Sequence, residues 1–420
     1  MKRRDVVGAL LVLVSALANA LAGIGTAQAR SGSGDLPAAA KSAITEQLTA
    51  AVTRGDTPGV VALVVDRNGE IYAGTAGQFD IASKKPMPAD AIFTIASMTK
   101  PVTSLAILML VDQGKIALDD PVSKFLPGFE NQQVITKFNE ADGTYQTRPA
   151  KRAMTIRHLL THTSGIGYAF CSPVVAKLQE LTKKDEWELP LLNDPGDEWH
   201  YSASTRVLGH VVEKVTGQSL EEWYQAHIFQ PLGMKDTSFA VPTGKMSRTP
   251  TVYRHNGSSF EISPRRPIQN TPTPPYLGDG GLYSTAHDYG IFIRLLLNGG
   301  QLNGKRIVSE RSVKLMGENN IGTVMVTQQP AVAPITKPFP LGAGRDKFGL
   351  GFQLTAQSAD TQRYRSAGSM SWAGIYNTEF WIDPKEQIGG ILLMQTLPFY
   401  DDGAIHALQS FEEAVYRSVR

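Results

Sequence analysis

The chain has 420 residues, of which 42% are hydrophobic and 19% are charged, so it is long and apolar enough to bury a large core. This composition excludes a disordered chain, and the formal net charge of +2 gives no reason to expect nucleic acid or an anionic membrane as a partner. The single cysteine, Cys171, excludes an intrachain disulfide, and no cysteine-nucleophile signature surrounds it. We interpret Cys171 as a small buried hydrophobe and expect a small-molecule substrate.

The N-terminus has the organisation of a targeting segment. Three basic residues, 2–4, precede an apolar run over residues 6–22, and small residues follow as far as Ala27-Gln28-Ala29. This order predicts a secretory signal peptide over residues 1–29 and a periplasmic or secreted protein, exported by a Sec-type or a twin-arginine route. A retained membrane anchor is the alternative, because the run is barely long enough to span a bilayer. After cleavage we expect no stable membrane span.

The sequence patterns at both ends of the remaining chain predict strands beside a helix. The composition of residues 30–41 predicts a flexible lead-in. The elements expected after it are, in chain order, a helix over 41–53, a hairpin of strands over 59–65 and 70–74, strands over 378–382 and 388–394, and a helix over 404–416. Because hairpins at the two ends enclose mainly helical patterns, we expect an α/β (α+β) domain over residues 42–420 with one antiparallel sheet built from both termini. The sheet lobe would comprise about 42–100 and 340–420, and the helical lobe about 101–339.

Ser97-Met98-Thr99-Lys100 joins a candidate nucleophile to a candidate proton acceptor at the start of a helix that is apolar nearly all round. Residues three apart share a helix face, so the Ser97 hydroxyl and the Lys100 amine should project into the same space. A lysine can activate a serine if burial keeps part of the amine neutral near pH 7. The alternative is a serine that caps the helix and a lysine that extends to solvent.

A second candidate cluster lies at residues 199–204, just before a helix predicted over 207–217. Tyr201 would sit in a loop, where tyrosine is usually a packing residue. Beside a cation such as Lys100, its phenol would lose a proton more readily and could act as a general base. His200 and Ser202 adjoin it and are candidate substrate-binding residues, although a hydrogen-bonding structural role also fits His200.

His158 and His162 lie four residues apart, which is the spacing of two metal ligands on a helix. No glutamate completes the H-E-x-x-H arrangement of zinc hydrolases, so we expect no metal and no other cofactor. The chain also contains no G-x-S-x-G sequence, which removes the motif support for an α/β-hydrolase fold.

Several blocks together resemble the serine β-lactamase and penicillin-binding-protein superfamily. They are Phe93 to Lys100, Ile156 to Gly165, Tyr201-Ser202 with Leu208-Gly209, Pro231 to Met234, and Gly280 to Thr285 followed by Asp288. The blocks occur in the family's order and cover nearly all of the chain after residue 41. The resemblance implies a β-lactamase-like fold and a serine hydrolase that works through an acyl-enzyme on Ser97, with Lys100 and Tyr201 as its catalytic partners.

The family's third motif matches Trp372-Ala373-Gly374, where class C β-lactamases carry a lysine. A tryptophan followed by a small residue and glycine resembles the family VIII carboxylesterases instead. Ala203 is a second departure, because β-lactamases place there an asparagine that binds the substrate amide. An aromatic face suits an uncharged acyl or alcohol group, whereas a lysine can pair with a carboxylate. Both departures favour an ester substrate over a penicillin.

By this resemblance the backbone N–H groups of Ser97 and Ile375 would form the oxyanion hole, and Gly374 would let the backbone approach the substrate. Trp372 and Gly374 join His200 and Ser202 as candidate substrate-binding residues. The predicted function is a secreted serine carboxylesterase that acts on a small ester or amide. The alternatives are a β-lactamase, D,D-peptidase or D-aminopeptidase of the same fold, and a non-catalytic binding or filament-forming protein.

Overall fold

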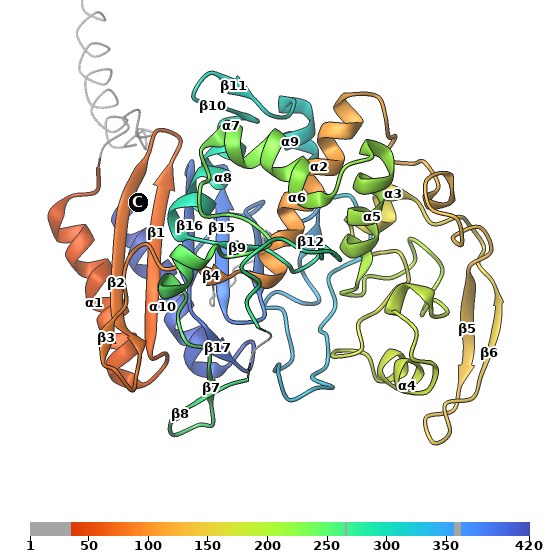
Figure 1. The fold of residues 1–420 in the computed structure, drawn as a ribbon, viewed down its shortest axis with the longest axis horizontal. Helices are drawn as coiled ribbons and strands as arrows, with labels where there is room; N and C mark the ends of the chain where they lie inside the picture. The colour runs from red at the N-terminus through yellow and green to blue at the C-terminus, as the bar shows by residue number, and fades with distance from the viewer. Residues whose placement is uncertain (1–34, 265–266, 357–362) are drawn as a thin grey trace, which may run out of the picture. The chain divides into compact units, whose positions relative to one another are not determined.

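A computed structural model describes residues 35–264, 267–356 and 363–420 (Figure 1). Its α-helices are α1 (Ala38–Arg54), α2 (Thr99–Asp112), α3 (Ile156–Leu160), α4 (Pro173–Thr182), α5 (Ser204–Thr216), α6 (Leu220–Tyr224), α7 (Gln230–Leu232), α8 (Ala286–Leu297), α9 (Glu310–Met316) and α10 (Asp402–Val419). The predicted signal peptide, residues 1–29, lies outside the described residues, as does the lead-in as far as residue 34. None of the helices within the described ranges is both long and apolar enough to cross a membrane.

The main sheet is antiparallel and contains eight strands. They are, in their order across the sheet, β12 (Lys347–Phe348), β13 (Gln353–Leu354), β14 (Met370–Gly374), β15 (Thr378–Asp383), β16 (Ile388–Leu393), β1 (Gly59–Asp66), β2 (Glu70–Asp80) and β3 (Lys85–Pro86). At its centre the N-terminal β1 pairs with the C-terminal β16, with Val61 opposite Leu393. The sheet is therefore built from both ends of the chain, which confirms the predicted fold class.

Both faces of this sheet are covered, and this explains why β1 is a continuous apolar run. Side chains alternate between the two faces of a strand. Leu63 belongs to the large core that also contains α2 and α8, whereas Val64 packs on the opposite side with α1 and α10. Close packing extends to the backbone, since a Cβ added at Gly290 of α8 would lie 2.6 Å from a Leu63 methyl group.

The terminal elements extend further than the sequence patterns predict. Helix α1 begins at Ala38 inside the expected lead-in, and β2 continues to Asp80 beyond the expected end at Gly74. The second half of β2 is only half-buried, so its residues carry no apolar alternation that would have revealed it. The helical part of the chain also contains the hairpin of β5 (Gln133–Phe138) and β6 (Tyr145–Pro149), at the right of Figure 1.

Smaller groups of strands lie outside the main sheet. These are β4 (Phe93–Thr94) with β9 (Tyr283–Ser284), β10 (Gln301–Leu302) with β11 (Lys305–Arg306), and β7 (Tyr253–His255) with β8 (Phe260–Ile262) and β17 (Thr396–Leu397). The β4–β9 pair aligns Phe93 with Ser284 immediately before the turn that carries Ser97. The segment with Ser97 is thereby fixed to the loop that precedes α8.

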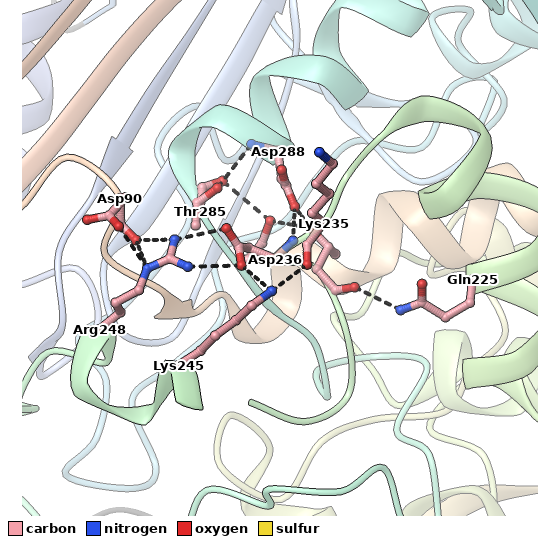
Figure 2. Close-up of polar contacts among 10 residues, drawn as sticks. Asp90, Gln225, Lys235, Asp236, Lys245, Arg248, Thr285 and Asp288 are labelled. Carbon is pink, nitrogen blue, oxygen red and sulfur yellow. Dashed lines mark hydrogen bonds and ion pairs between the residues drawn. The ribbon is translucent and has the colours of Figure 1, made fainter. Parts of the chain in front are cut away.

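A charged cluster secures the chain around the N-terminus of α8 (Figure 2). The Asp236 carboxylate contacts Lys245 Nζ at 2.7 Å and Arg248 Nη2 at 2.8 Å, and Arg248 also reaches the Asp90 carboxylate at 2.9 Å. The buried Asp288 accepts a hydrogen bond of 2.7 Å from the Asp236 backbone N–H. These contacts satisfy every carboxylate in the cluster with protein donors, so we assign the cluster a structural role.

Candidate active site

Ser97 lies in a short 3₁₀ turn, Ala96–Met98, that leads directly into α2. Ala96, the residue before Ser97, has a φ of +43°, which lies in the left-handed region that residues other than glycine rarely adopt. Such conformations cluster at functional sites, where the surrounding structure holds them in place. Here the turn presents the Ser97 side chain to a cavity instead of to the core beneath α2.

Lys100, one turn into α2, is buried and has three oxygen partners. Its Nζ lies 3.1 Å from Ser97 Oγ, 3.2 Å from Tyr168 Oη and 2.7 Å from the Asp279 carbonyl oxygen. Burial lowers the pKa of Lys100 to about 7, and this effect outweighs the opposing attraction of the Asp279 carboxylate. A large fraction of Lys100 is therefore uncharged near neutral pH.

Tyr201 approaches Ser97 from the loop before α5. Its hydroxyl lies 2.7 Å from Ser97 Oγ, so the serine oxygen has both Tyr201 and Lys100 within hydrogen-bond distance. Burial raises the pKa of Tyr201 above its ordinary value. The phenol is therefore a neutral hydrogen-bond donor in this structure, and losing its proton is harder than the sequence-based interpretation assumed.

Behind Lys100 lies a second polar group centred on Asp279. Its carboxylate accepts hydrogen bonds from the Tyr168 hydroxyl and, at 2.9 Å, from Arg206 Nε of α5. Burial alone would raise the pKa of Asp279, but the positive charges of Lys100 and Arg206 outweigh it and lower the pKa. Tyr168 consequently directs its hydroxyl proton to Asp279 and turns its oxygen lone pair toward Lys100.

Aromatic rings support the other side of Tyr201. The Trp372 ring lies 5.0 Å from that of Tyr201 between centroids, and the His162 ring lies 5.1 Å from it. His162 is held from behind, because its Nδ1 lies 3.0 Å from the buried Ser202 hydroxyl. Burial, together with the positive charge of Lys100, depresses the pKa of His162 well below its ordinary value. His162 is therefore a neutral packing partner that fixes the position of Tyr201.

A cavity of about 360 Å³ opens at Ser97. Its lining near the serine includes Tyr168, Phe170, Tyr201, Asp279, Trp372 and Ile375. Aromatic and aliphatic side chains make up much of the lining, and polar groups lie both beside Ser97 and at Ser371 and Glu379, a mixture that suits a small-molecule site. The predicted residues Ser97, Tyr201, Trp372 and Ile375 thus share one cavity.

Gly374 lies where β14 approaches the turn before Ser97. A Cβ at this position would lie 2.3 Å from the Ile95 carbonyl oxygen and 2.3 Å from Thr378 Oγ1. The glycine therefore permits a close approach between β14 and the turn before Ser97, and its predicted role beside a substrate stays a prediction. This contact brings Ile375, the next residue, to the cavity that Ser97 lines.

Two other candidates lie away from the cavity lining. Ser202 is fully buried and bonds His162 and Ser204, whereas the His200 ring lies 3.1 Å from the Glu198 carboxylate. Neither side chain is part of the cavity lining, so the contacts that the structure gives them are structural, and their substrate-binding roles stay predictions.

The two histidines, His158 and His162, and the cysteine, Cys171, make contacts within the fold. His158 Nδ1 accepts a hydrogen bond from the Thr155 backbone at the start of α3, whereas His162 Nδ1 contacts Ser202. Within the described residues no group of three or more His, Cys, Asp or Glu side chains could hold a metal ion. Cys171 is buried, and burial raises the pKa of its thiol to about 12.

Sequence reasoning missed Tyr168 and Arg206 as part of this arrangement. Tyr168 lies in an irregular segment and Arg206 in the first turn of α5, where an arginine is unremarkable. Only the folded chain brings both to Asp279, so no spacing in the sequence could have identified them.

Comparison with known proteins agrees with this geometry. A family model described as Beta-lactamase matches residues 43–414. The chain belongs to the beta-lactamase family. Esterase EstB of Burkholderia gladioli is 30% identical over 371 residues, covering 80% of this chain and 86% of EstB. ML-236A carboxylate methylbutanoyltransferase mlcH of Penicillium citrinum is 28% identical over 396 residues, covering 88% of this chain and 93% of mlcH.

A solved structure shows the same fold. Simvastatin synthase LovD from Aspergillus terreus, in its LovD6 mutant form, superposes with a TM-score of 0.73 at 25% identity, covering 90% of this chain and 94% of the LovD chain. The match spans both the sheet and the helical part. As a member of the beta-lactamase family with these relatives, the chain is a serine hydrolase.

Proposed function

We propose that this protein hydrolyses carboxylic esters through an acyl-enzyme on Ser97. The observation that supports the proposal most strongly is the pair of hydrogen-bond contacts at Ser97 Oγ, 3.1 Å to Lys100 Nζ and 2.7 Å to Tyr201 Oη. A serine hydroxyl needs a proton acceptor to attack a carbonyl carbon, and both partners are in reach. The cavity beside them gives an ester room to bind.

Lys100 is the general base in this proposal. In its neutral form the amine has two hydrogens and one lone pair. The Asp279 carbonyl and Tyr168 Oη each accept one hydrogen, because Tyr168 donates its own proton to Asp279. The lone pair is then left for the Ser97 hydroxyl proton. Because burial lowers the pKa of Lys100 to about 7, this form is available under ordinary conditions.

Tyr201 is the proton donor to the leaving group. Its raised pKa keeps it neutral, and its hydroxyl already points at Ser97 Oγ. When Ser97 Oγ attacks the ester carbonyl, its proton passes to Lys100, and the departing alcohol oxygen takes a proton from Tyr201. The Lys100 ammonium restores the phenol, and in the second half of the cycle a water molecule attacks the acyl carbon and the same groups operate in reverse.

The negative charge on the carbonyl oxygen needs stabilisation in both steps. The backbone N–H groups of Ser97 and Ile375 are our candidates, since both residues line the cavity and Gly374 brings Ile375 against the serine turn. An N–H group aimed at such an oxygen contributes about 3–4 kcal/mol to transition-state stabilisation.

The ester class follows from the lining and from the relatives. Trp372 presents an aromatic face where class C β-lactamases carry a cation, which favours an uncharged group over the carboxylate of a penicillin. EstB is named an esterase and mlcH a methylbutanoyltransferase, so both act on acyl groups. The signal sequence predicted over residues 1–29 adds export to the proposal.

The test measures turnover of a short-chain aryl ester and of benzylpenicillin by the same purified enzyme. We expect kcat/KM for the ester to exceed that for the penicillin by at least about two orders of magnitude, the equivalent of roughly 3 kcal/mol. Ser97→Ala should remove ester turnover and labelling by a fluorophosphonate. Ser104→Ala is the matched control, because Ser104 is a buried serine farther along α2 that does not line the cavity.

Comparable efficiencies on the two substrates would restore the β-lactamase interpretation. Wild-type labelling in a folded Ser97→Ala variant would show that another residue is the nucleophile. Absence of both turnover and labelling in the wild-type enzyme would favour a non-catalytic protein.

A further inference from the structure

The cavity at Ser97 continues around one edge of the sheet. Strand β13 pairs with β14 only at Met370 and Ser371, and within the described residues no strand pairs with that edge of β14 from Trp372 to Gly374. Side chains from both faces of β14 therefore meet the same cavity. Trp372 lines it on the face of Ser97, whereas Ser371 and Ala373 line it from the opposite face.

On that opposite face lies a polar chamber, which we define by Ser371, Glu379 and Tyr400. Glu379 of β15 stands directly opposite Ala373, so its side chain shares the face of Ala373 and Ser371. All three residues of the chamber line the cavity. The small Ala373 side chain leaves space between the chamber and the part of the cavity that contains Trp372.

Glu379 is an unusual residue in this position. It is 6% exposed, and its Oε1 atom has no hydrogen-bond partner. The neighbouring cation, Arg365, is already committed to Glu412, with 2.8 Å between Nη2 and Oε2. Burial raises the pKa of Glu379 to about 8, although Arg365 opposes the shift. At neutral pH the carboxyl therefore holds a proton, and it can both donate and accept a hydrogen bond.

A buried polar group without a partner costs stability, and native proteins contain few of them. An apolar side chain of similar size would avoid that cost, because Glu379 Oε1 has no partner among the described residues. The Tyr400 hydroxyl accepts from the Leu341 backbone at 3.2 Å, which leaves its own proton available, and Ser371 adds a second hydroxyl. The chamber thus offers donors and acceptors to a ligand in the cavity.

We propose that this chamber binds a hydroxyl group carried by the substrate at the end of an apolar chain, and so sets substrate preference. The inference rests on the proposed esterase function, since the chain is taken to extend from the ester carbonyl at Ser97. A hydroxyl both donates and accepts, which matches a protonated carboxyl and a serine. Two arginines of the lining, Arg363 and Arg365, already pair with Asp346 and Glu412, so a carboxylate would leave water without gaining a free cation, and an ammonium would lose its water beside those two cations.

The experiment compares aryl esters of ω-hydroxy acids with aryl esters of unsubstituted acids matched in chain length, over a series of lengths. At the length that reaches the chamber, we expect the wild-type enzyme to prefer the hydroxylated ester by at least about tenfold in kcat/KM. Corresponding ω-amino and ω-carboxy esters should be poorer than the hydroxylated one. Esters with the hydroxyl on the alcohol half identify which half of the substrate enters.

Substitutions in the chamber test whether its residues cause the preference for the hydroxylated ester. Glu379→Leu and Ser371→Ala should each lower the ratio of hydroxylated to unsubstituted ester, with Glu379→Leu bringing it near one. Glu379→Gln, which also donates and accepts, should retain most of the ratio and serves if Glu379→Leu does not fold. Ser369→Ala is the matched control, because Ser369 is a buried serine nearby that does not line the cavity and should leave the ratio unchanged.

The outcomes separate this inference from the proposed function. If the wild-type enzyme hydrolyses unsubstituted esters in a Ser97-dependent way but shows no hydroxyl preference in either half of the substrate, the chamber proposal is wrong and the esterase stands. A preference that survives in Glu379→Leu and Ser371→Ala would likewise overturn it. If the wild-type enzyme shows no Ser97-dependent ester hydrolysis, the chamber proposal and the esterase proposal are both wrong.

Discussion

At the scale of single residues, the central feature is a lysine that is buried beside a serine. The sequence indicated that Ser97 and Lys100 share a helix face, and the structure adds why the amine is partly neutral. Burial lowers the pKa of Lys100, the Asp279 carboxylate raises it and Arg206 lowers it again. Burial, adjusted by these surrounding charges, therefore sets the pH at which the proposed base becomes active.

A pH profile tests this balance. Because the base must be unprotonated, kcat/KM for an aryl ester should rise with pH through an acid limb near 7, the pKa of Lys100, and level off above it. Arg206→Gln removes a positive charge that lowers this pKa, so the limb should move to higher pH. Arg206→Lys keeps the charge and is the control, for which the limb should stay nearly in place. A profile without an acid limb, or a shift to lower pH in Arg206→Gln, would exclude Lys100 as the base.

The site residues differ in how visible they are in the sequence. Ser97 and Lys100 are one helical turn apart, so their spacing alone brings them together. Tyr168 and Glu379 carry no local pattern, because their importance arises from contacts with residues far away in the chain. Their chemistry depends on burial, which a sequence pattern in an irregular segment or a short strand does not specify.

At the scale of secondary structure, the contact between β14 and the serine turn determines the geometry of the site. Gly374 lies so close to the Ile95 carbonyl that any side chain would separate the strand from the turn. Strands β15 and β16 were predictable because each is a short apolar run bounded by turn residues. The hairpin β5–β6 was not, since most of its residues are exposed and lack the alternation of a half-buried strand.

Gly374→Ala tests the importance of this contact. The added Cβ would lie 2.3 Å from a backbone oxygen, so the strand must move, at a cost of about 1–3 kcal/mol in stability. We expect a lower Tm and a loss of at least about tenfold in kcat/KM, because the Ile375 N–H moves with the strand. Gly69→Ala is the control, since nothing lies within 4 Å of a Cβ at that turn. Wild-type activity in Gly374→Ala would show that the position of this strand does not affect catalysis.

At the scale of the whole molecule, the sheet separates two cores with different tasks. The core that contains α2 lies beneath Ser97, the proposed nucleophile, whereas the core between the sheet and α1 and α10 lies on the opposite face of the sheet. The two hairpins at the chain ends made this arrangement predictable. The extension of the cavity to Glu379 was not, because it depends on where β13 stops pairing with β14.

Phe411→Ala should therefore affect stability and activity differently. Phe411 is fully buried in α10, and removing its ring should cost about 3–5 kcal/mol. We expect a clearly lower Tm in calorimetry with kcat/KM within about twofold of wild type at temperatures where the variant is folded. Ile262→Ala, at a side chain that is 68% exposed, should change neither quantity. A large fall in kcat/KM for folded Phe411→Ala would show that the two cores are coupled.

The pairing of β1 with β16 also constrains how the chain acquires its structure. These two neighbouring strands are separated by most of the sequence, and contacts between such distant segments form slowly. A ribosome releases β1 and α2 long before β16, so the helix of the proposed nucleophile lacks the sheet face that supports it until β16 has been synthesised. A nascent chain would thus gain hydrolytic activity only after β16 has left the ribosome.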